Sequence, residues 1–136
     1  MTQSEIELVQ ASFAKVVPIS QQAATLFYDR LFSLNPSLKA LFKGDMEDQK
    51  MKLIRTLGYV VSRLDSIPTI IQDVEALALR HIDYGVEPAH YDDVGAALIW
   101  TLEQGLGSGF DPETKTAWLD TYDLLSNAMK RAAYVT

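Results

Sequence analysis

The chain has 136 residues, of which 48% are hydrophobic and 22% are charged, and its formal net charge is −6. This length suits a single domain over residues 1–136, with room for a core and a pocket, and the composition is that of an ordinary globular protein. The negative charge disfavours nucleic-acid binding, no apolar run approaches a membrane span, and the lack of cysteine excludes disulfides and thiolate nucleophiles.

Apolar residues recur at helical spacing, and no alternating run is long enough to indicate a strand, so the predicted fold class is all-α. The first predicted helix begins at Ser4, which can cap it, and ends before Pro18. A second helix is predicted over about residues 20–34, and a short helical piece follows through Phe42.

Four further helices complete the prediction of six substantial helices and one short one. They are predicted over about residues 46–64, from Pro68 to the string Tyr84-Gly85-Val86, over about residues 88–106, and from Asp111-Pro112 onward. Gly85 stands where a helix end often needs a left-handed residue.

Three polar side chains interrupt apolar helical stripes. His81 follows Ile70 and Val74 at helical spacing, while Gln49 and Tyr28 interrupt two other stripes in the same way. The polar imidazole of His81, which can bind a metal, is unexpected on an apolar helix face unless it has a binding partner there. We therefore expect the three side chains to point into one cavity, as around a buried cofactor.

Several short strings resemble those of globins, most closely the bacterial single-domain haemoglobins and the globin module of flavohaemoglobins. The strings are Leu26-Phe27-Tyr28, Leu41-Phe42, Gln49 with Leu53, Arg80-His81, Tyr84-Gly85-Val86, Ala89-His90-Tyr91, Val94-Gly95, and Ala117-Trp118 with Tyr122. The resemblance covers nearly the whole chain. It implies a globin fold of about seven helices that enclose a haem pocket, in one globin domain.

The resemblance also implies haem b as the cofactor, with His81 as the proximal ligand of the iron. Phe42 would pack on the porphyrin face, Tyr28 and Gln49 would be the distal hydrogen-bonding pair, and Leu53 would form an apolar wall beside the gas ligand. The further cofactor contacts that it implies are Val86, Tyr91 and Val94.

One residue departs from the family pattern. In flavohaemoglobins a glutamate of the last helix joins the proximal histidine and a tyrosine in a hydrogen-bonded group; Tyr91 matches that tyrosine, but the glutamate position falls at Ala133. A carboxylate there would make the histidine a stronger electron donor, so its loss puts peroxidase-like or dioxygenase chemistry in doubt. The 136 residues also contain no flavin or nicotinamide module, so turnover would need an external reductase.

Three functions stay open at this point. The first is a reversible binder of oxygen, nitric oxide or carbon monoxide, for carriage, storage or sensing. The second is a nitric oxide dioxygenase that uses a separate reductase, and the third is a haem-free helical binding module. A secretory signal is absent, so we expect a cytoplasmic protein, either a monomer or a homodimer.

Simpler roles for the candidate residues also stay open. Tyr28 could donate a hydrogen bond to a carbonyl at the edge of the core, and Gln49 could cap the first turn of its helix. Tyr28, Gln49 or Lys52 could also move onto the iron when no gas is bound. His90, in the first turn of a helix, is expected to be structural.

Overall fold

The computed structural model describes residues 1–83 and 85–134, and these residues form helices and no strands, which confirms the all-α class. The described residues form six α-helices and four short 3-10 helices, and the predicted piece before Phe42 is one of the latter. The α-helices are α1 (Gln3–Val16), α2 (Ser20–Leu34), α3 (Met46–Ser62), α4 (Ile67–Asp83), α5 (His90–Leu106) and α6 (Pro112–Tyr134). The 3-10 helices are η1 (Val17–Ile19), η2 (Pro36–Leu41), η3 (Leu64–Ser66) and η4 (Gly107–Gly109). Tyr84, part of one of the strings above, lies outside the described residues.

Local hydrogen bonds explain where several helices begin. The amide of Glu5 donates to Thr2 Oγ1 (3.1 Å) and the amide of Thr2 donates to Glu5 Oε1 (3.2 Å), a reciprocal capping box. The cap of α1 is therefore Thr2, and the prediction of Ser4 was wrong. At the last helix, Asp111 Oδ1 accepts from the amide of Thr114 (2.8 Å).

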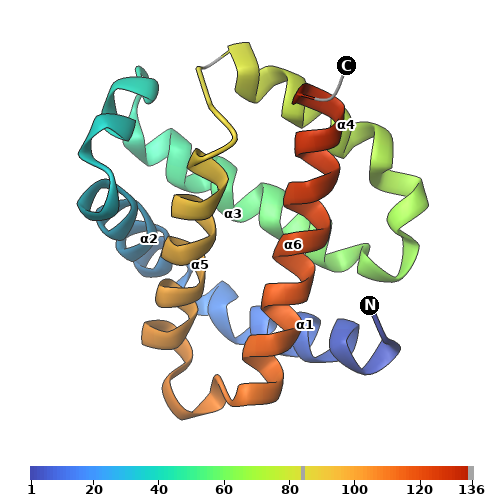
Figure 1. Cartoon of the computed structure of the whole chain (residues 1–136). Helices are drawn as coiled ribbons and strands as arrows, with labels where there is room; N and C mark the ends of the chain where they lie inside the picture. The colour runs from blue at the N-terminus through green and yellow to red at the C-terminus, as the bar shows by residue number, and fades with distance from the viewer. Residues whose placement is uncertain (84, 135–136) are drawn as a thin grey trace.

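The core lies between helices that are far apart in sequence. Figure 1 shows α5 and α6 side by side, with α1 crossing behind α6; α2 packs mainly on α5, and α4 packs mainly on α6. The indole of Trp118, 2% exposed, donates from Nε1 to Ser12 Oγ at 2.8 Å and so ties α6 to α1 in the interior. Other buried apolar side chains include Val9, Leu31, Ile70, Ala78, Ala97 and Leu102.

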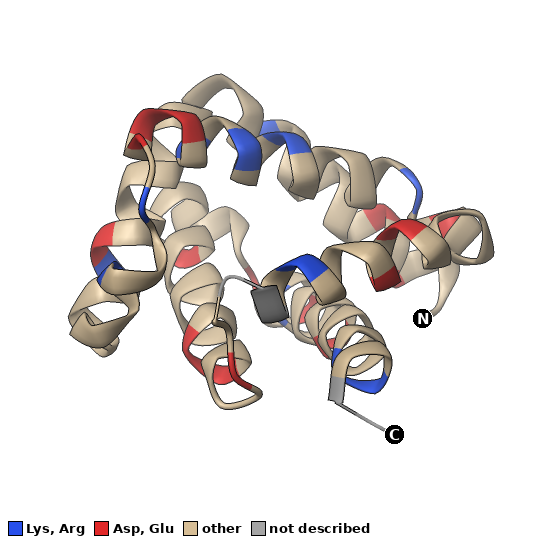
Figure 2. Ribbon diagram, turned by 90° about the horizontal axis from the view of Figure 1, so that it is seen from above, with Lys and Arg blue, Asp and Glu red and all other residues tan. Residues whose placement is uncertain are grey.

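Helices α3 and α4 are successive in the chain but rest on different supports, since α3 packs on α2 and α1 whereas α4 packs on α6. Figure 2 shows that they meet at η3 and diverge from there, so that the start of α3 and the end of α4 lie apart. The hydroxyl of Tyr59 on α3 donates to Asp73 Oδ2 on α4 at 2.7 Å, close to the corner. The two helices are thus fixed at one end and open at the other.

No helix in the described part of the chain combines the length and the apolar character that a membrane crossing requires.

Candidate haem site

His81 lies in the last turn of α4, where the predicted stripe places it. Ile70 and Val74 behind it are buried, and His81 itself is half-buried. Its Nδ1 lies 2.7 Å from the carbonyl oxygen of Leu77, one turn earlier in the helix. Since a carbonyl only accepts, Nδ1 carries the proton of the neutral ring, and the lone pair of the ring is on Nε2.

Burial favours this neutral form. It lowers the pKa of the His81 imidazole below its usual value, and the charge of Arg80 acts in the same direction, while the bond to the Leu77 carbonyl opposes both. A neutral imidazole whose Nδ1–H is held by a carbonyl is the form that binds metals through Nε2. His81 could therefore bind a metal through Nε2.

Tyr28 and Gln49 come together in space, although twenty-one positions separate them in the sequence. Tyr28 on α2 is 6% exposed, and its hydroxyl donates to the main-chain carbonyl of Gln49 on α3, with an O···O distance of 3.4 Å. A hydrogen bond of that length is weak. The hydroxyl is thus placed beside the first turn of α3 but held only loosely.

Aromatic rings surround Tyr28 on the side of η2. Its ring meets that of Phe42 edge to face, with the centroids 5.4 Å apart, and Phe42 meets Phe32 in the same manner at 5.5 Å. Phe27 packs against Tyr28 at 5.0 Å. These contacts hold the ring of Tyr28 and place the half-buried Phe42 next to it.

Leu53 lies one turn after Gln49 on α3, is half-buried, and borders a small cavity of about 20 Å³ that is lined mostly by apolar side chains. Phe27, Leu57 and Trp118 are among the other residues that line it. Leu53 therefore presents an apolar side chain to the interior, and its place as a wall beside a gas ligand stays a prediction.

Tyr91, at the start of α5, is 5% exposed and is held by α6. The hydroxyl of Tyr122 donates to the Tyr91 carbonyl (2.5 Å), and Lys130 Nζ lies 5.6 Å from the centre of the Tyr91 ring. Gly95 allows this approach, because a Cβ there would lie 2.7 Å from the ring of Tyr122. We had not predicted these contacts, since no local sequence signal indicates which helix covers Gly95.

The other predicted contacts lie near the ends of α4 and α5. Gly85 has a φ of +90°, in the left-handed region, as predicted for this helix end. The amide of Val86 donates to the carbonyl of His81 at 3.0 Å, so this loop turns back on the helix that carries the candidate ligand. Val86 and Val94 are both half-buried against the core.

The second histidine is part of a helix start. Its Nδ1 accepts from the amide of Glu87 at 3.0 Å, so His90 has the structural role that the sequence indicated. Among the described residues, no group of three or more histidine, aspartate and glutamate side chains could hold a metal ion. The half-buried His81, whose Nδ1 proton is held by a carbonyl, has the chemistry of the single imidazole that haem iron needs from a protein.

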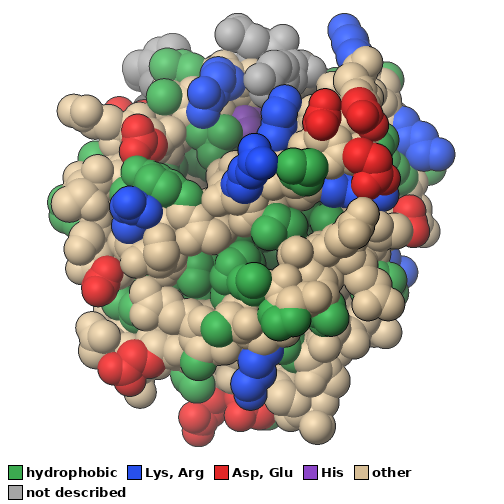
Figure 3. Space-filling view, turned by 180° about the vertical axis from the view of Figure 1, so that it is seen from behind, with side chains coloured by type: hydrophobic (Ala, Val, Ile, Leu, Met, Phe, Trp, Pro, Cys, Tyr) green, Lys and Arg blue, Asp and Glu red, His purple; other side chains and the backbone are tan. Residues whose placement is uncertain are grey.

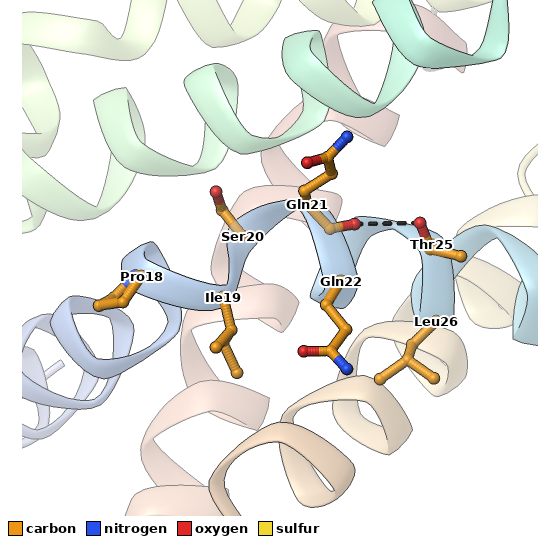
Figure 4. A pocket seen from close by; sticks show the side chains of 7 residues that line it. All are labelled: Pro18, Ile19, Ser20, Gln21, Gln22, Thr25 and Leu26. Atoms are coloured by element: carbon orange, nitrogen blue, oxygen red, sulfur yellow. Dashed lines mark hydrogen bonds between the residues drawn. The ribbon is translucent and has the colours of Figure 1, made fainter.

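An open surface depression lies elsewhere on the protein, away from these residues. It measures about 630 Å³ and is open to solvent at the start of α2; Figure 4 shows the side chains that line it, which are Pro18, Ile19, Ser20, Gln21, Gln22, Thr25 and Leu26. None of the predicted site residues belongs to it. Figure 3 shows the face opposite to that of Figure 1, where hydrophobic side chains gather in a hollow and basic side chains group beside a histidine at its upper edge.

A family model described as Globin matches residues 25–129, well over half of the sequence. The chain belongs to the globin family. The matched segment contains all of the candidate residues discussed above, from Tyr28 to Tyr122. The predicted family and the predicted globin fold are therefore confirmed.

One curated relative of this globin is a longer protein. It is 26% identical over 129 residues to a flavohemoprotein of Vibrio cholerae, and the match covers 93% of this globin but only 33% of that protein. The globin thus spans about a third of the length of this curated relative.

A solved structure shows the same fold. It is an engineered carbene transferase made from a Rhodothermus marinus protein that is named as a candidate nitric oxide dioxygenase. The TM-score is 0.85 at 24% sequence identity, and the match covers 95% of this globin and 90% of the other chain.

Proposed function

We propose that this globin binds haem b and thereby reversibly binds oxygen and other diatomic gases, including nitric oxide and carbon monoxide, for carriage, storage or sensing. The observation that supports the proposal is the contact of His81 Nδ1 with the Leu77 carbonyl, because a neutral ring with its proton on Nδ1 would bind iron through Nε2. When bound, the haem supplies an iron with one coordination position for a gas.

The distal residues support the same proposal. Tyr28 is buried, and its hydroxyl is held by one long hydrogen bond, so little is lost when it turns toward a polar gas ligand. Gln49 follows in the first turn of α3, from where its amide can donate as well. Phe42 and Leu53 would exclude water from the gas, and Val86, Tyr91 and Val94 would bound the haem on the other side.

The ligand assignment is tested by His81→Ala, with His90→Ala as the matched control. Purified protein should show the intense absorption of haem; His81→Ala should lose or alter that spectrum, and His90→Ala should keep it. Equal spectra for both variants would overturn the ligand assignment. A protein without haem absorption after haem is supplied would instead indicate a haem-free helical binding module.

The distal assignment is tested by Tyr28→Phe, with Tyr59→Phe on the exposed side of α3 as the control. A hydrogen bond to a charged or strongly polar ligand contributes about 1.5–3 kcal/mol, so oxygen release should become about 10- to 150-fold faster in Tyr28→Phe. Release from Tyr59→Phe should match the parent. An unchanged release rate in Tyr28→Phe would exclude the distal role.

A second candidate is a nitric oxide dioxygenase that works with an external reductase. The flavohemoprotein relative favours it, because that name joins a flavin with a haem in one protein. Ala133 weighs against it, since it stands at the sequence position where the family pattern has a glutamate, so the carboxylate of that pattern is missing there. Nitrate measured per haem, with and without a reducing partner, separates the two: sustained nitrate formation would show an enzyme, and one equivalent without turnover would leave a gas binder.

A further inference from the structure

The charges of this globin are distributed unevenly. Residues 46–63, which are α3 and the residue that caps it, carry two acidic and four basic side chains, so the rest of the chain carries sixteen acidic and eight basic ones. One helix of a strongly acidic protein is therefore basic. Figure 2 shows the basic positions along α3 after its acidic first turn.

The basic side chains of α3 form a ridge on its solvent side. Lys52, Arg55 and Arg63 are all exposed, at spacings of three and eight residues, so the ridge is about 16 Å long. Lys50 is paired with Glu47 at 3.1 Å, whereas Lys52 and Arg55 form no ion pair with any described residue.

Adjacent positive charges on a helix destabilise it slightly, and no acidic side chain lies three or four positions from Arg55 to offset this. The nearby acids are Asp48, one turn before Lys52, and Asp73 of α4, which is engaged with the Tyr59 hydroxyl. The ridge thus keeps a positive charge toward the solvent.

Large exposed side chains accompany these charges. Met51 is 51% exposed and Tyr59 is 39% exposed, and the guanidinium of Arg63 lies 4.2 Å from the centre of the Tyr59 ring. Methionine, tyrosine and arginine are the residues that protein interfaces favour over the rest of the surface. The outer face of α3 therefore combines a positive charge with residue types that are common in protein–protein interfaces.

We propose that the outer face of α3, formed by Met51, Lys52, Arg55, Tyr59 and Arg63, docks a small acidic electron-carrier protein. Leu53 of the same helix packs against the core, and Gln49 is half-buried one turn before it, so a partner on this face would lie within about one helix width of the proposed gas site. The inference rests on the proposed function. The reduced carrier would give up one electron, which the iron of a bound haem would accept, and no bond between heavy atoms would be formed or broken.

The experiment measures binding of the purified globin to a flavodoxin, an acidic flavin protein, by fluorescence anisotropy, with the basic cytochrome c as the probe of opposite charge. Flavodoxin should bind, and its affinity should fall about tenfold or more as the salt concentration rises from 20 to 200 mM. The double variant Lys52→Glu with Arg55→Glu should weaken binding by at least about tenfold. Cytochrome c should not bind better to the parent than to this variant.

The matched control reverses two exposed cations elsewhere, Lys15→Glu with Arg131→Glu, and should bind flavodoxin nearly as well as the parent. If the α3 double variant fails to fold, Lys52→Gln with Arg55→Gln decides in its place. Equal weakening by the control pair would show only a general charge effect and would overturn the proposal. Stronger binding to phosphatidylserine vesicles than to flavodoxin would also overturn it, because the face would then suit a membrane surface. The haem absorption of the same samples tests the proposed function independently, because haem could be bound whether or not flavodoxin docks on α3.

Discussion

At the residue scale, burial sets the ionisation of the tyrosine that we place on the distal side. It raises the pKa of the Tyr28 phenol to about 12 from an ordinary value of 10. Tyr28 is therefore a neutral hydrogen-bond donor at any physiological pH. The burial that makes the phenol hard to ionise is also what would keep water from competing for its hydroxyl.

The raised pKa of Tyr28 predicts how stability depends on pH. Between pH 10 and pH 12 the folded state keeps the phenol proton and the unfolded state loses it, so this contribution is complete below pH 10 and is lost as pH rises toward 12. The loss is about 1.4 kcal/mol per pH unit. Burial raises the pKa of Tyr122 as well, so two phenols contribute.

Denaturant unfolding at several pH values checks this. Above pH 10, the slope of the unfolding free energy against pH reports how many protons are released on unfolding. Tyr28→Phe should lower that number by about one. A slope that stays the same in the variant would show that this phenol is not buried in the folded protein.

Gly95 predicts a steric effect. In Gly95→Ala the new Cβ would lie 2.7 Å from the Tyr122 ring, which must shift, so we expect a loss of about 1–3 kcal/mol in the free energy of unfolding. Gly58→Ala is the control, because its Cβ would meet Phe13 at an ordinary 3.7 Å and alanine favours the helix by up to about 1 kcal/mol. Urea unfolding should therefore show opposite signs for the two variants; equal effects would contradict the close approach at Gly95.

At the element scale, the contact of α1 with α6 depends on one buried hydrogen bond. Ser12→Ala would leave the indole N–H of Trp118 without its acceptor in the core, and we expect a loss of about 1–3 kcal/mol. Thr25→Ala is the control, since its exposed hydroxyl bonds only the carbonyl of Gln21 in its own helix. Thermal and urea unfolding check both variants, and a Ser12→Ala protein as stable as the parent would show that the bond is replaceable.

The same scale shows which helix boundaries the sequence could indicate. The breaks at Pro18 and Pro36 and the start at Pro112 were predicted because proline lacks an amide donor and constrains the preceding residue. The start of α5 was predicted at Pro88 but lies at His90, and α3 was predicted to reach residue 64 but ends at Ser62. After α3 the chain continues into the 3-10 helix η3, and before α5 it forms a hydrogen-bonded turn in which the Tyr91 amide donates to the Pro88 carbonyl. Hydrophobic spacing does not distinguish either from an α-helix.

At the scale of the whole molecule, the described helices share one core, so the predicted single domain should unfold in one step. Fluorescence of the two tryptophans and far-ultraviolet circular dichroism should give the same midpoint. Haem should raise that midpoint in the parent and in His90→Ala but less in His81→Ala, since a ligand that binds only the folded state stabilises it. Separate transitions for the two signals would show that the chain is not one cooperative unit.

The sequence by itself determined the helical class, the approximate span of each helix and the three polar residues on apolar stripes. It could do so because helical periodicity is visible in the spacing of residues that are close together in the sequence. The resemblance in short strings then indicated the family. Only the tertiary structure decided that the Tyr28 hydroxyl meets the first turn of α3, that α6 clamps Tyr91 through Tyr122 across Gly95, and that the cations of α3 face the solvent. Each of these depends on which helices pack together and at what angle, and the spacing of residues along one helix does not contain that information.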